Sequence, residues 1–211
     1  MIRAVLWDID GTLLESEPMH WEAVMVVANH LGAELGPDDH FGFLGLSMPA
    51  VHAKIAARTP LAVDVAGFVD AVTDHYVAHV DRVAPRAGAL ETIDRLAGRG
   101  VLQACVSNAG ARVVVANLRR LGRPALAFGL SRDDVPRGKP HPDPYLAAAA
   151  RFGVDPADCL VVEDSPVGAA AGVAAGMRVI AWPEWAELTF EGVVARVERI
   201  EDLDWDAALG G

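Results

Sequence analysis

Two aspartates with one residue between them, Asp8 and Asp10, follow the first apolar stretch of the sequence. Residues 3–7 predict a short buried strand, and Gly11 and Thr12 come directly after the second acid. Two carboxylates at the mouth of a buried strand repel each other and resist the loss of water, so a bound cation would stabilise them. The alternative is a simple acidic turn, because Asp and Gly both favour turns.

Three later segments decide between these alternatives, because each brings further polar groups to the end of a predicted strand or to the loop after it. The segments are Ser107 with Asn108, Lys139, and Glu163 with Asp164. Each has a structural explanation when taken alone: a helix cap, an exposed loop lysine or a solvated turn. Parallel strands end at one edge of a sheet, however, and there the acids, the lysine and the hydroxyl would meet. That convergence favours a functional site over unrelated turns.

Strands and helices alternate from residue 85 onward. Apolar runs predict strands at 101–106, 125–130, 159–162 and 177–181. The segments between them predict helices, most of which end at a glycine. With the strand at 3–7, this alternation predicts an α/β fold, a doubly wound, Rossmann-like parallel sheet. In such sheets ligands bind beyond the carboxyl ends of the strands, where the acids lie.

A helical stretch interrupts the alternation after the first acidic turn. Residues 17–84 carry apolar side chains at helical spacing and predict four short helices without a strand. We therefore expect an α/β core domain formed by residues 1–16 and 85–211, and an inserted helical domain formed by residues 17–84. Within the core, Asp143 and Ser165 are predicted N-cap residues, each followed by a proline.

The composition is that of an ordinary globular protein with a sizeable core: 52% of the 211 residues are hydrophobic and 22% are charged. The formal net charge of -11 argues against nucleic-acid binding, which normally needs a basic surface. We expect no secretory leader, no membrane span and free thiols at Cys105 and Cys159, which lie in predicted strands. We therefore expect a cytoplasmic protein, a monomer or weak dimer, with no nucleic-acid or membrane partner.

The order of the polar segments, and the residues within them, resemble the haloacid dehalogenase superfamily. Four stretches are similar to its four motifs: Asp8-x-Asp10-Gly11-Thr12, Ser107-Asn108, Gly138-Lys139-Pro140-x-Pro142-Asp143 and Glu163-Asp164-Ser165. The resemblance covers nearly the whole chain and is greatest to the branch of phosphatases and β-phosphoglucomutase-like enzymes. It implies that the helical insertion is a cap domain of the first type.

The resemblance implies a role for each motif residue. Asp8 would attack phosphorus and form an aspartyl-phosphate, and Asp10 would protonate the leaving oxygen and then activate water. Lys139 would balance negative charge on Asp8 and on the phosphoryl group. Ser107 would donate a hydrogen bond to a phosphoryl oxygen, with Asn108 in the same substrate-binding turn. A second aspartate at this spacing favours phosphoryl transfer over dehalogenation, in which halide leaves without a proton.

The resemblance also implies a magnesium cofactor and a small phosphorylated metabolite as partner. Asp8, the backbone carbonyl of Asp10 and Asp164 would hold Mg²⁺, and Glu163 would orient the ion through water. The ion would screen the repulsion between the acids and allow a dianionic phosphate to approach.

Within the implied cap, Gly45 and His20 are the candidate substrate-binding residues. Similar enzymes often carry a cation just after the Ser of the Gly-rich loop, and Met48 stands at that position here. The missing cation argues against a β-phosphoglucomutase-like phosphomutase, which would hold a bisphosphate. We predict a Mg²⁺-dependent phosphatase of a small phosphate monoester, with sugar phosphates among the candidates. A further alternative is a non-catalytic protein that retains the fold, against which the complete motif set argues.

Overall fold

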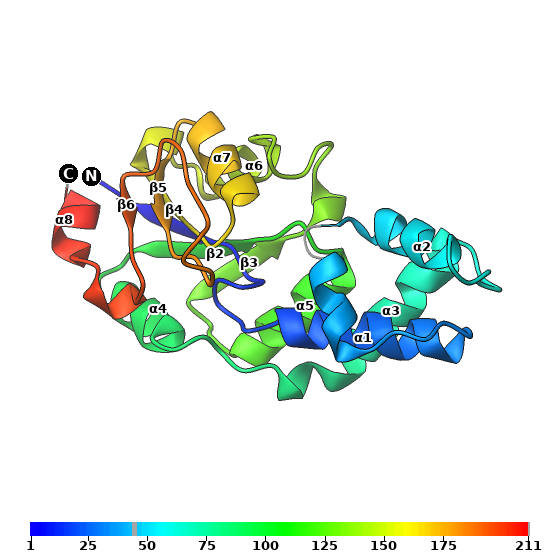
Figure 1. Ribbon diagram of the computed structural model, residues 1–211. Helices are drawn as coiled ribbons and strands as arrows, with labels where there is room; N and C mark the ends of the chain where they lie inside the picture. The colour runs from blue at the N-terminus through cyan, green and yellow to red at the C-terminus, as the bar shows by residue number, and fades with distance from the viewer. Residues whose placement is uncertain (44–45, 211) are drawn as a thin grey trace. The chain divides into compact units, whose positions relative to one another are not determined.

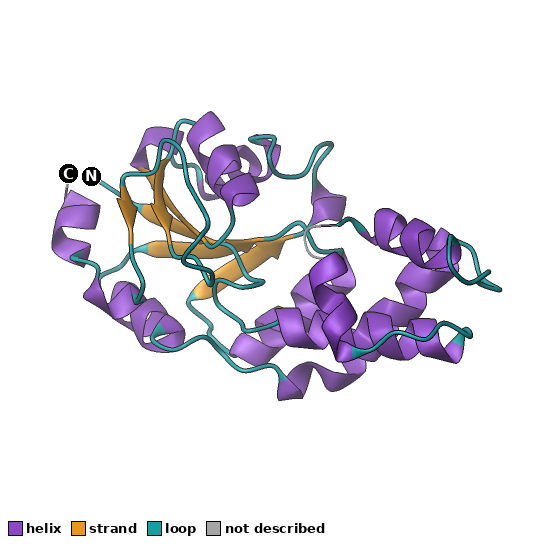
Figure 2. Cartoon of the chain, in the orientation of Figure 1, coloured by secondary structure: helices purple, strands orange, loops and turns teal. Residues whose placement is uncertain are grey.

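The computed structural model describes residues 1–43 and 46–210 of the chain. These residues form two compact units (Figures 1 and 2): Met1–Glu15 with Ala84–Gly211, and Ser16–Val83. The first, the α/β unit, contains all the strands of the described chain. The second, the helical unit, consists of helices and loops.

A six-stranded parallel sheet forms the centre of the α/β unit, in the order β3-β2-β1-β4-β5-β6. Its strands are β1 (Ala4–Trp7), β2 (Leu102–Val106), β3 (Leu126–Leu130), β4 (Cys159–Glu163), β5 (Arg178–Ala181) and β6 (Ala195–Arg196). Every residue of β1 and β4 is buried, as expected for a parallel sheet covered on both faces. The predicted doubly wound parallel sheet is confirmed. Its strand order reverses beside β1, where ligands bind in such folds.

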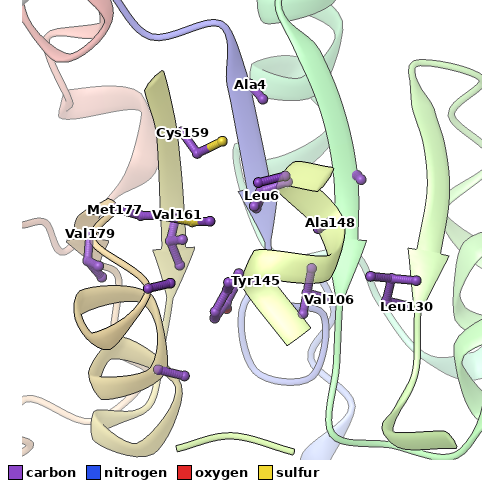
Figure 3. Close-up of a cluster of buried hydrophobic side chains, with 14 of the residues drawn as sticks. Ala4, Leu6, Val106, Leu130, Tyr145, Ala148, Cys159, Val161, Met177 and Val179 are labelled. Atoms are coloured by element: carbon purple, nitrogen blue, oxygen red, sulfur yellow. The ribbon is translucent and has the colours of Figure 1, made fainter. Parts of the chain in front are cut away.

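Helices pack on both faces of this sheet (Figure 1). They are α4 (Ala89–Gly98), α5 (Ala111–Leu121), α6 (Asp143–Phe152), α7 (Pro166–Ala174) and α8 (Trp205–Gly210), with short 3-10 helices at Arg132–Asp134, Pro156–Asp158 and Ile200–Asp202. A buried cluster joins one face of the sheet to α6 and α7, and Figure 3 shows part of it. In this cluster Leu6 and Val161 of the strands pack with Tyr145 and Ala148 of α6. The spacing of Tyr145 and Ala148 places both on the buried side of their helix.

The two predicted N-caps differ in outcome. Ser165 caps α7 as predicted, because its hydroxyl accepts a hydrogen bond from the Gly168 amide (3.1 Å). The prediction for Asp143 is wrong, since this residue is the first of α6 and makes no capping hydrogen bond. Its carboxylate instead binds the guanidinium group of Arg137 (Nη2–Oδ1 2.8 Å). An ion pair with a neighbouring side chain thus replaces the bond to a helix amide.

The helical unit consists of α1 (Glu17–His30), α2 (Met48–Ala56) and α3 (Val65–His79), with 3-10 helices at Pro37–Gly42 and Val80–Arg82. Its interior is apolar and includes the buried side chains of Trp21, Ile55, Phe68 and Tyr76. Of the four predicted helices, the one that begins at Pro37 is a short 3-10 helix. Across the described parts of the whole chain, no helix combines the length and the apolar character needed to cross a membrane.

Candidate active site

β1 places the first acidic pair at the carboxyl edge of the sheet. The strand is paired with a parallel neighbour on each side, and the amide of Asp8 extends the pairing to the carbonyl of Val162 (3.0 Å). Gly11 then reverses the chain with a φ of 83°, a conformation that favours glycine. A Cβ at this position would overlap the Asp164 carboxylate. The close approach of turn and carboxylate therefore requires glycine.

The ammonium group of Lys139 is buried beside Asp8. Its Nζ donates to Asp8 Oδ1 (2.6 Å), to Glu163 Oε1 (2.6 Å) and to the carbonyl of Val106 (2.8 Å), which uses all three of its protons. The lysine backbone is held by Asn108, whose side-chain amide donates to the Lys139 carbonyl (3.0 Å) and accepts from the Lys139 amide (2.8 Å). Asn108 thus fixes the loop that carries the lysine, and its contact with substrate stays a prediction.

Glu163 is fully buried at the end of β4 and accepts hydrogen bonds on both carboxylate oxygens. Oε1 accepts from Lys139 and from the Tyr145 hydroxyl (2.6 Å), and Oε2 accepts from the Ser165 hydroxyl (3.1 Å). Gly168 of α7 lies so close that a Cβ there would overlap the carboxylate. Glu163 therefore orients Lys139 through a direct, fully enclosed ion pair.

Asp8, Glu163 and Asp164 form an acidic cluster, in which one carboxylate oxygen from each residue lies within 4.8 Å of the others. In the described part of the chain, Asp8 Oδ2 is buried and has no hydrogen-bond partner. An ionised oxygen in this state is costly unless a cation faces it. The Thr12 hydroxyl donates to Asp164 Oδ1 (3.2 Å) and so holds this acid in the cluster. Carboxylate oxygens suit a hard cation, and the residues present fit Mg²⁺.

The electrostatics of the acidic cluster support the same conclusion. Burial raises the pKa of Asp8 well above its usual value; Lys139 opposes this effect, and Glu163 and Asp164 add to it. Burial and the charge of Glu163 raise the pKa of Asp164 to about 7. Burial lowers the pKa of Lys139, but Asp8 and Glu163 outweigh it and the net direction is upward. One lysine faces three carboxyl groups, so a divalent cation would balance the remaining negative charge.

Two donors from outside the acidic cluster hold the carboxylate of Asp10. The hydroxyl of Ser107, just after β2, donates to Oδ2 (3.0 Å), and the side-chain amide of Asn117 in α5 donates to Oδ1 (3.1 Å). Ser107 in turn accepts from the amide of Ala109 (3.0 Å). The structure thus brings the predicted acid and the predicted hydroxyl together. The metal contact of the Asp10 backbone carbonyl stays a prediction.

Sequence reasoning misses three side chains of this region: Asn117, Tyr145 and Arg86. Asn117 and Tyr145 are completely buried in otherwise apolar helix faces, where a polar group needs a partner. That pattern is the signal that could have found them. Arg86 donates to the carbonyl of Gly11 (2.8 Å), and no motif marks it.

The sequence predicts two substrate-binding residues outside the α/β unit, His20 and Gly45. His20 belongs to α1, whereas Gly45 lies outside the described residues. The ring of His20 stacks on Tyr76 with ring centres 4.3 Å apart. It also lines a pocket of about 300 Å³ within this unit. The wall of the pocket further includes Trp21, His40, Phe43 and Met48. Among the described residues on this wall, none is Lys or Arg.

A model of the haloacid dehalogenase-like hydrolases matches residues 2–176. Hexitol phosphatase A of Escherichia coli (strain K12) is 30% identical over 179 residues, which cover 85% of this chain and 82% of that protein. Protein SUPPRESSOR OF QUENCHING 1, chloroplastic, of Arabidopsis thaliana is 34% identical over 190 residues, which are 85% of this chain. The chain spans only 18% of the length of that protein.

Solved structures are similar over nearly the whole chain. CbbY from Rhodobacter sphaeroides in complex with phosphate covers 100% of both chains, with a TM-score of 0.88 and 27% identity. A mutant of CbbY from the same organism, in complex with xylulose-(1,5)bisphosphate, covers 97% of both chains, with a TM-score of 0.85 and 26% identity. Phosphate and a sugar bisphosphate are therefore bound by proteins that share this fold.

Proposed function

Because the chain belongs to the haloacid dehalogenase-like hydrolases, we propose that it is a magnesium-dependent phosphatase of small phosphate monoesters. The reaction would pass through an aspartyl-phosphate on Asp8. One observation carries this proposal: Asp8 Oδ1 is fixed by the ammonium group of Lys139, whereas Oδ2 has no hydrogen-bond partner among the described residues. The negative charge of this fixed carboxylate is thus only partly paired, which suits both a cation beside it and nucleophilic attack on phosphorus.

Lys139 would favour the ionised form of Asp8 and so oppose the effect of burial, because its ammonium nitrogen lies 2.6 Å from Oδ1. The same ammonium group would stabilise negative charge as it develops on the phosphoryl oxygens. Asp8, Asp164 and the backbone carbonyl of Asp10 would hold Mg²⁺. The bound ion would neutralise negative charge on the dianionic substrate. Glu163 would act indirectly, by fixing the position of the lysine.

We propose that Asp10 transfers the protons of the reaction. Its carboxyl group would protonate the leaving alcohol oxygen and then accept a proton from the water that hydrolyses the aspartyl-phosphate. Ser107 and Asn117 hold the two carboxylate oxygens, so the group is oriented before the substrate arrives. Ser107 is the proposed donor to a phosphoryl oxygen, and because its hydroxyl has a single proton, that bond would replace the one to Asp10 when the substrate binds.

We propose that the helical unit is a cap that selects the alcohol part of the substrate. The pocket within this unit has aromatic and apolar walls and a polar pair, Glu17 and His40 (Oε1–Nε2 2.9 Å). With no cation on its described wall, the pocket suits an uncharged, hydroxyl-bearing group better than a second phosphate. The name of hexitol phosphatase A supports a phosphate of a sugar or a sugar alcohol.

A bisphosphate substrate or a phosphomutase reaction is the second candidate. The CbbY complex with xylulose-(1,5)bisphosphate favours it, because that protein shares the fold of this chain. Met48 argues against it, since similar enzymes often carry a cation at this position to hold the second phosphate.

The test is phosphate release from a panel of phosphate esters, measured with Mg²⁺ and with a chelator. The panel contains hexitol phosphates, aldose phosphates and a sugar bisphosphate, and the proteins are the wild type, Asp8→Asn and the surface control Asp94→Asn. We expect the wild type and the control to release phosphate with Mg²⁺ only, and Asp8→Asn to release none. No release from any ester, or full activity of Asp8→Asn, would overturn the proposal. Conversion of a sugar 1-phosphate to the 6-phosphate without release would establish the mutase instead.

A further inference from the structure

The guanidinium group of Arg86 joins two loops of the α/β unit. Nη1 donates to the carbonyls of Gly11 (2.8 Å) and Trp182 (2.6 Å), and Nη2 donates to the carbonyl of Pro183 (2.7 Å). The guanidinium carbon also lies 4.1 Å from the centre of the Trp182 indole ring. One of these loops follows β1 and the other follows β5, so a single side chain fixes both.

The strand between β1 and β5 in the sheet is β4, whose end carries Glu163 and Asp164. Both loops that Arg86 binds touch this end. The amide of Trp182 donates to the carbonyl of Glu163 (2.6 Å). On the other side, Gly11 packs against the Asp164 carboxylate, and the neighbouring Thr12 donates its hydroxyl to Asp164 (3.2 Å). Arg86 therefore holds the surroundings of Asp164 from two sides.

The backbone of the segment around Arg86 is fixed without its side chain. The Arg86 amide donates to the carbonyl of Leu13 (2.9 Å), the Glu15 amide donates to that of Ala84 (2.9 Å), and Leu14 pairs with Pro85. The guanidinium group is thus additional to the contacts that hold this segment in place. Its three carbonyl contacts use the planar fork of an arginine, which a lysine cannot reproduce.

We propose that Arg86 is a positioning residue of the metal site, which sets the affinity for Mg²⁺ by fixing the Gly11–Thr12 turn against Asp164. The inference rests on the proposed function, because Asp164 and the backbone carbonyl of Asp10 are its proposed metal ligands. The Gly11 carbonyl that Arg86 binds belongs to the residue directly after Asp10. Arg86 thereby fixes the Gly11–Thr12 peptide, which packs against Asp164 and directly follows the proposed carbonyl ligand. Groups that orient metal ligands in this way typically change metal affinity by about 10- to 100-fold.

The experiment measures Mg²⁺ binding directly, by isothermal titration calorimetry of the full chain without substrate. The proteins are the wild type, Arg86→Gln, Arg86→Lys and the control Arg199→Gln. Arg199 is exposed and pairs with Glu201, and it lines the same surface groove as Arg86. We expect the Kd for Mg²⁺ to rise by about 10-fold or more in Arg86→Gln, to rise less in Arg86→Lys, and to stay unchanged in the control.

Two further measurements separate positioning from a purely structural role. The first is the unfolding temperature of the metal-free variants, and the second is phosphate release as a function of Mg²⁺ concentration. Positioning predicts a higher Mg²⁺ requirement, with kcat largely recovered at saturating Mg²⁺. An unchanged Kd in folded Arg86→Gln overturns the inference, as does unfolding of both Arg86 variants, which would make the residue purely structural.

The wild type distinguishes this inference from the proposed function. If the wild type binds Mg²⁺ and releases phosphate while Arg86→Gln binds Mg²⁺ equally well, only the role of Arg86 is wrong. If the wild type binds no Mg²⁺, the proposed magnesium dependence fails and the role of Arg86 fails with it. If the wild type binds Mg²⁺ but hydrolyses no ester, the Kd comparison still supports or overturns Arg86 as a positioning residue.

Discussion

Removal of metal should make the stability of the protein depend strongly on pH, through Asp164. Burial and the charge of Glu163 raise the pKa of this acid from an ordinary value of 3.8 to about 7. An acid with a raised pKa binds its proton more tightly in the folded than in the unfolded state. Protonated Asp164 therefore contributes its whole stabilisation of the folded state below the pKa that this group has in the unfolded chain. The stabilisation is lost as the pH rises through the pKa that the group has in the folded protein.

The size of this effect follows from the interval between the two pKa values. Between pH 5 and pH 8, the unfolding free energy falls over the two pH units from pH 5 to about pH 7, the pKa of Asp164 in the folded protein. Each unit corresponds to about 1.4 kcal/mol, so the metal-free protein should lose about 3 kcal/mol of unfolding free energy through Asp164. Mg²⁺ should restore stability at pH 8, where it binds the ionised carboxylate, and should have less effect at pH 5.

The assay is urea unfolding in the presence of a chelator at pH 5 and pH 8, followed by tryptophan fluorescence. The wild type is compared with Asp164→Asn, which has no ionisable group at this position, and with Asp70→Asn, which changes an exposed acid. Asp164→Asn should lose about 3 kcal/mol less than the wild type between the two pH values, and Asp70→Asn should behave as the wild type. Equal pH dependence of the wild type and Asp164→Asn would show that Asp164 does not cause the loss of stability.

Two substitutions test groups that surround the catalytic acids. Asn117→Ala removes a donor to Asp10 and should lower kcat by about 10-fold or more, because a misplaced acid slows proton transfer. The pH–rate profile should shift and KM should change little. An unaltered pH–rate profile would contradict this role of Asn117. Gly168→Ala forces a Cβ into the Glu163 carboxylate and should reduce the unfolding free energy in urea by about 1–3 kcal/mol. Gly98→Ala, which meets open space, is the matched control, and equal stability of the two variants would contradict this packing.

The sheet and the acids at its edge could be predicted because both are encoded locally. The run of β1 is apolar throughout, and that of β4 is apolar up to its last residue, Glu163. Chain direction in a parallel sheet fixes which end of each strand shares an edge. The convergence of Asp8, Lys139 and Glu163 follows from that rule, although the residues are far apart in the sequence.

The partners of the acids could not be predicted, because they depend on how helices pack. Asn117 reaches Asp10 across 107 positions of sequence, and only the placement of α5 brings the two together. The failed N-cap at Asp143 has a similar cause. A carboxylate there can bond a helix amide or a guanidinium group, and in the folded chain Asp143 pairs with Arg137. Ser165 carries no charge, and its hydroxyl does bond the helix amide as predicted.

The most direct test of the central claim is to detect the phosphoryl group on Asp8 itself. The wild type is mixed with Mg²⁺ and the best ester of the panel, quenched in acid within a turnover, and digested for mass spectrometry. We expect one added phosphoryl group on the peptide that contains Asp8, and none in Asp8→Asn treated in the same way. Rapid phosphate release by a wild type that carries no phosphoryl group at Asp8 at any quench time would show that Asp8 is not the nucleophile.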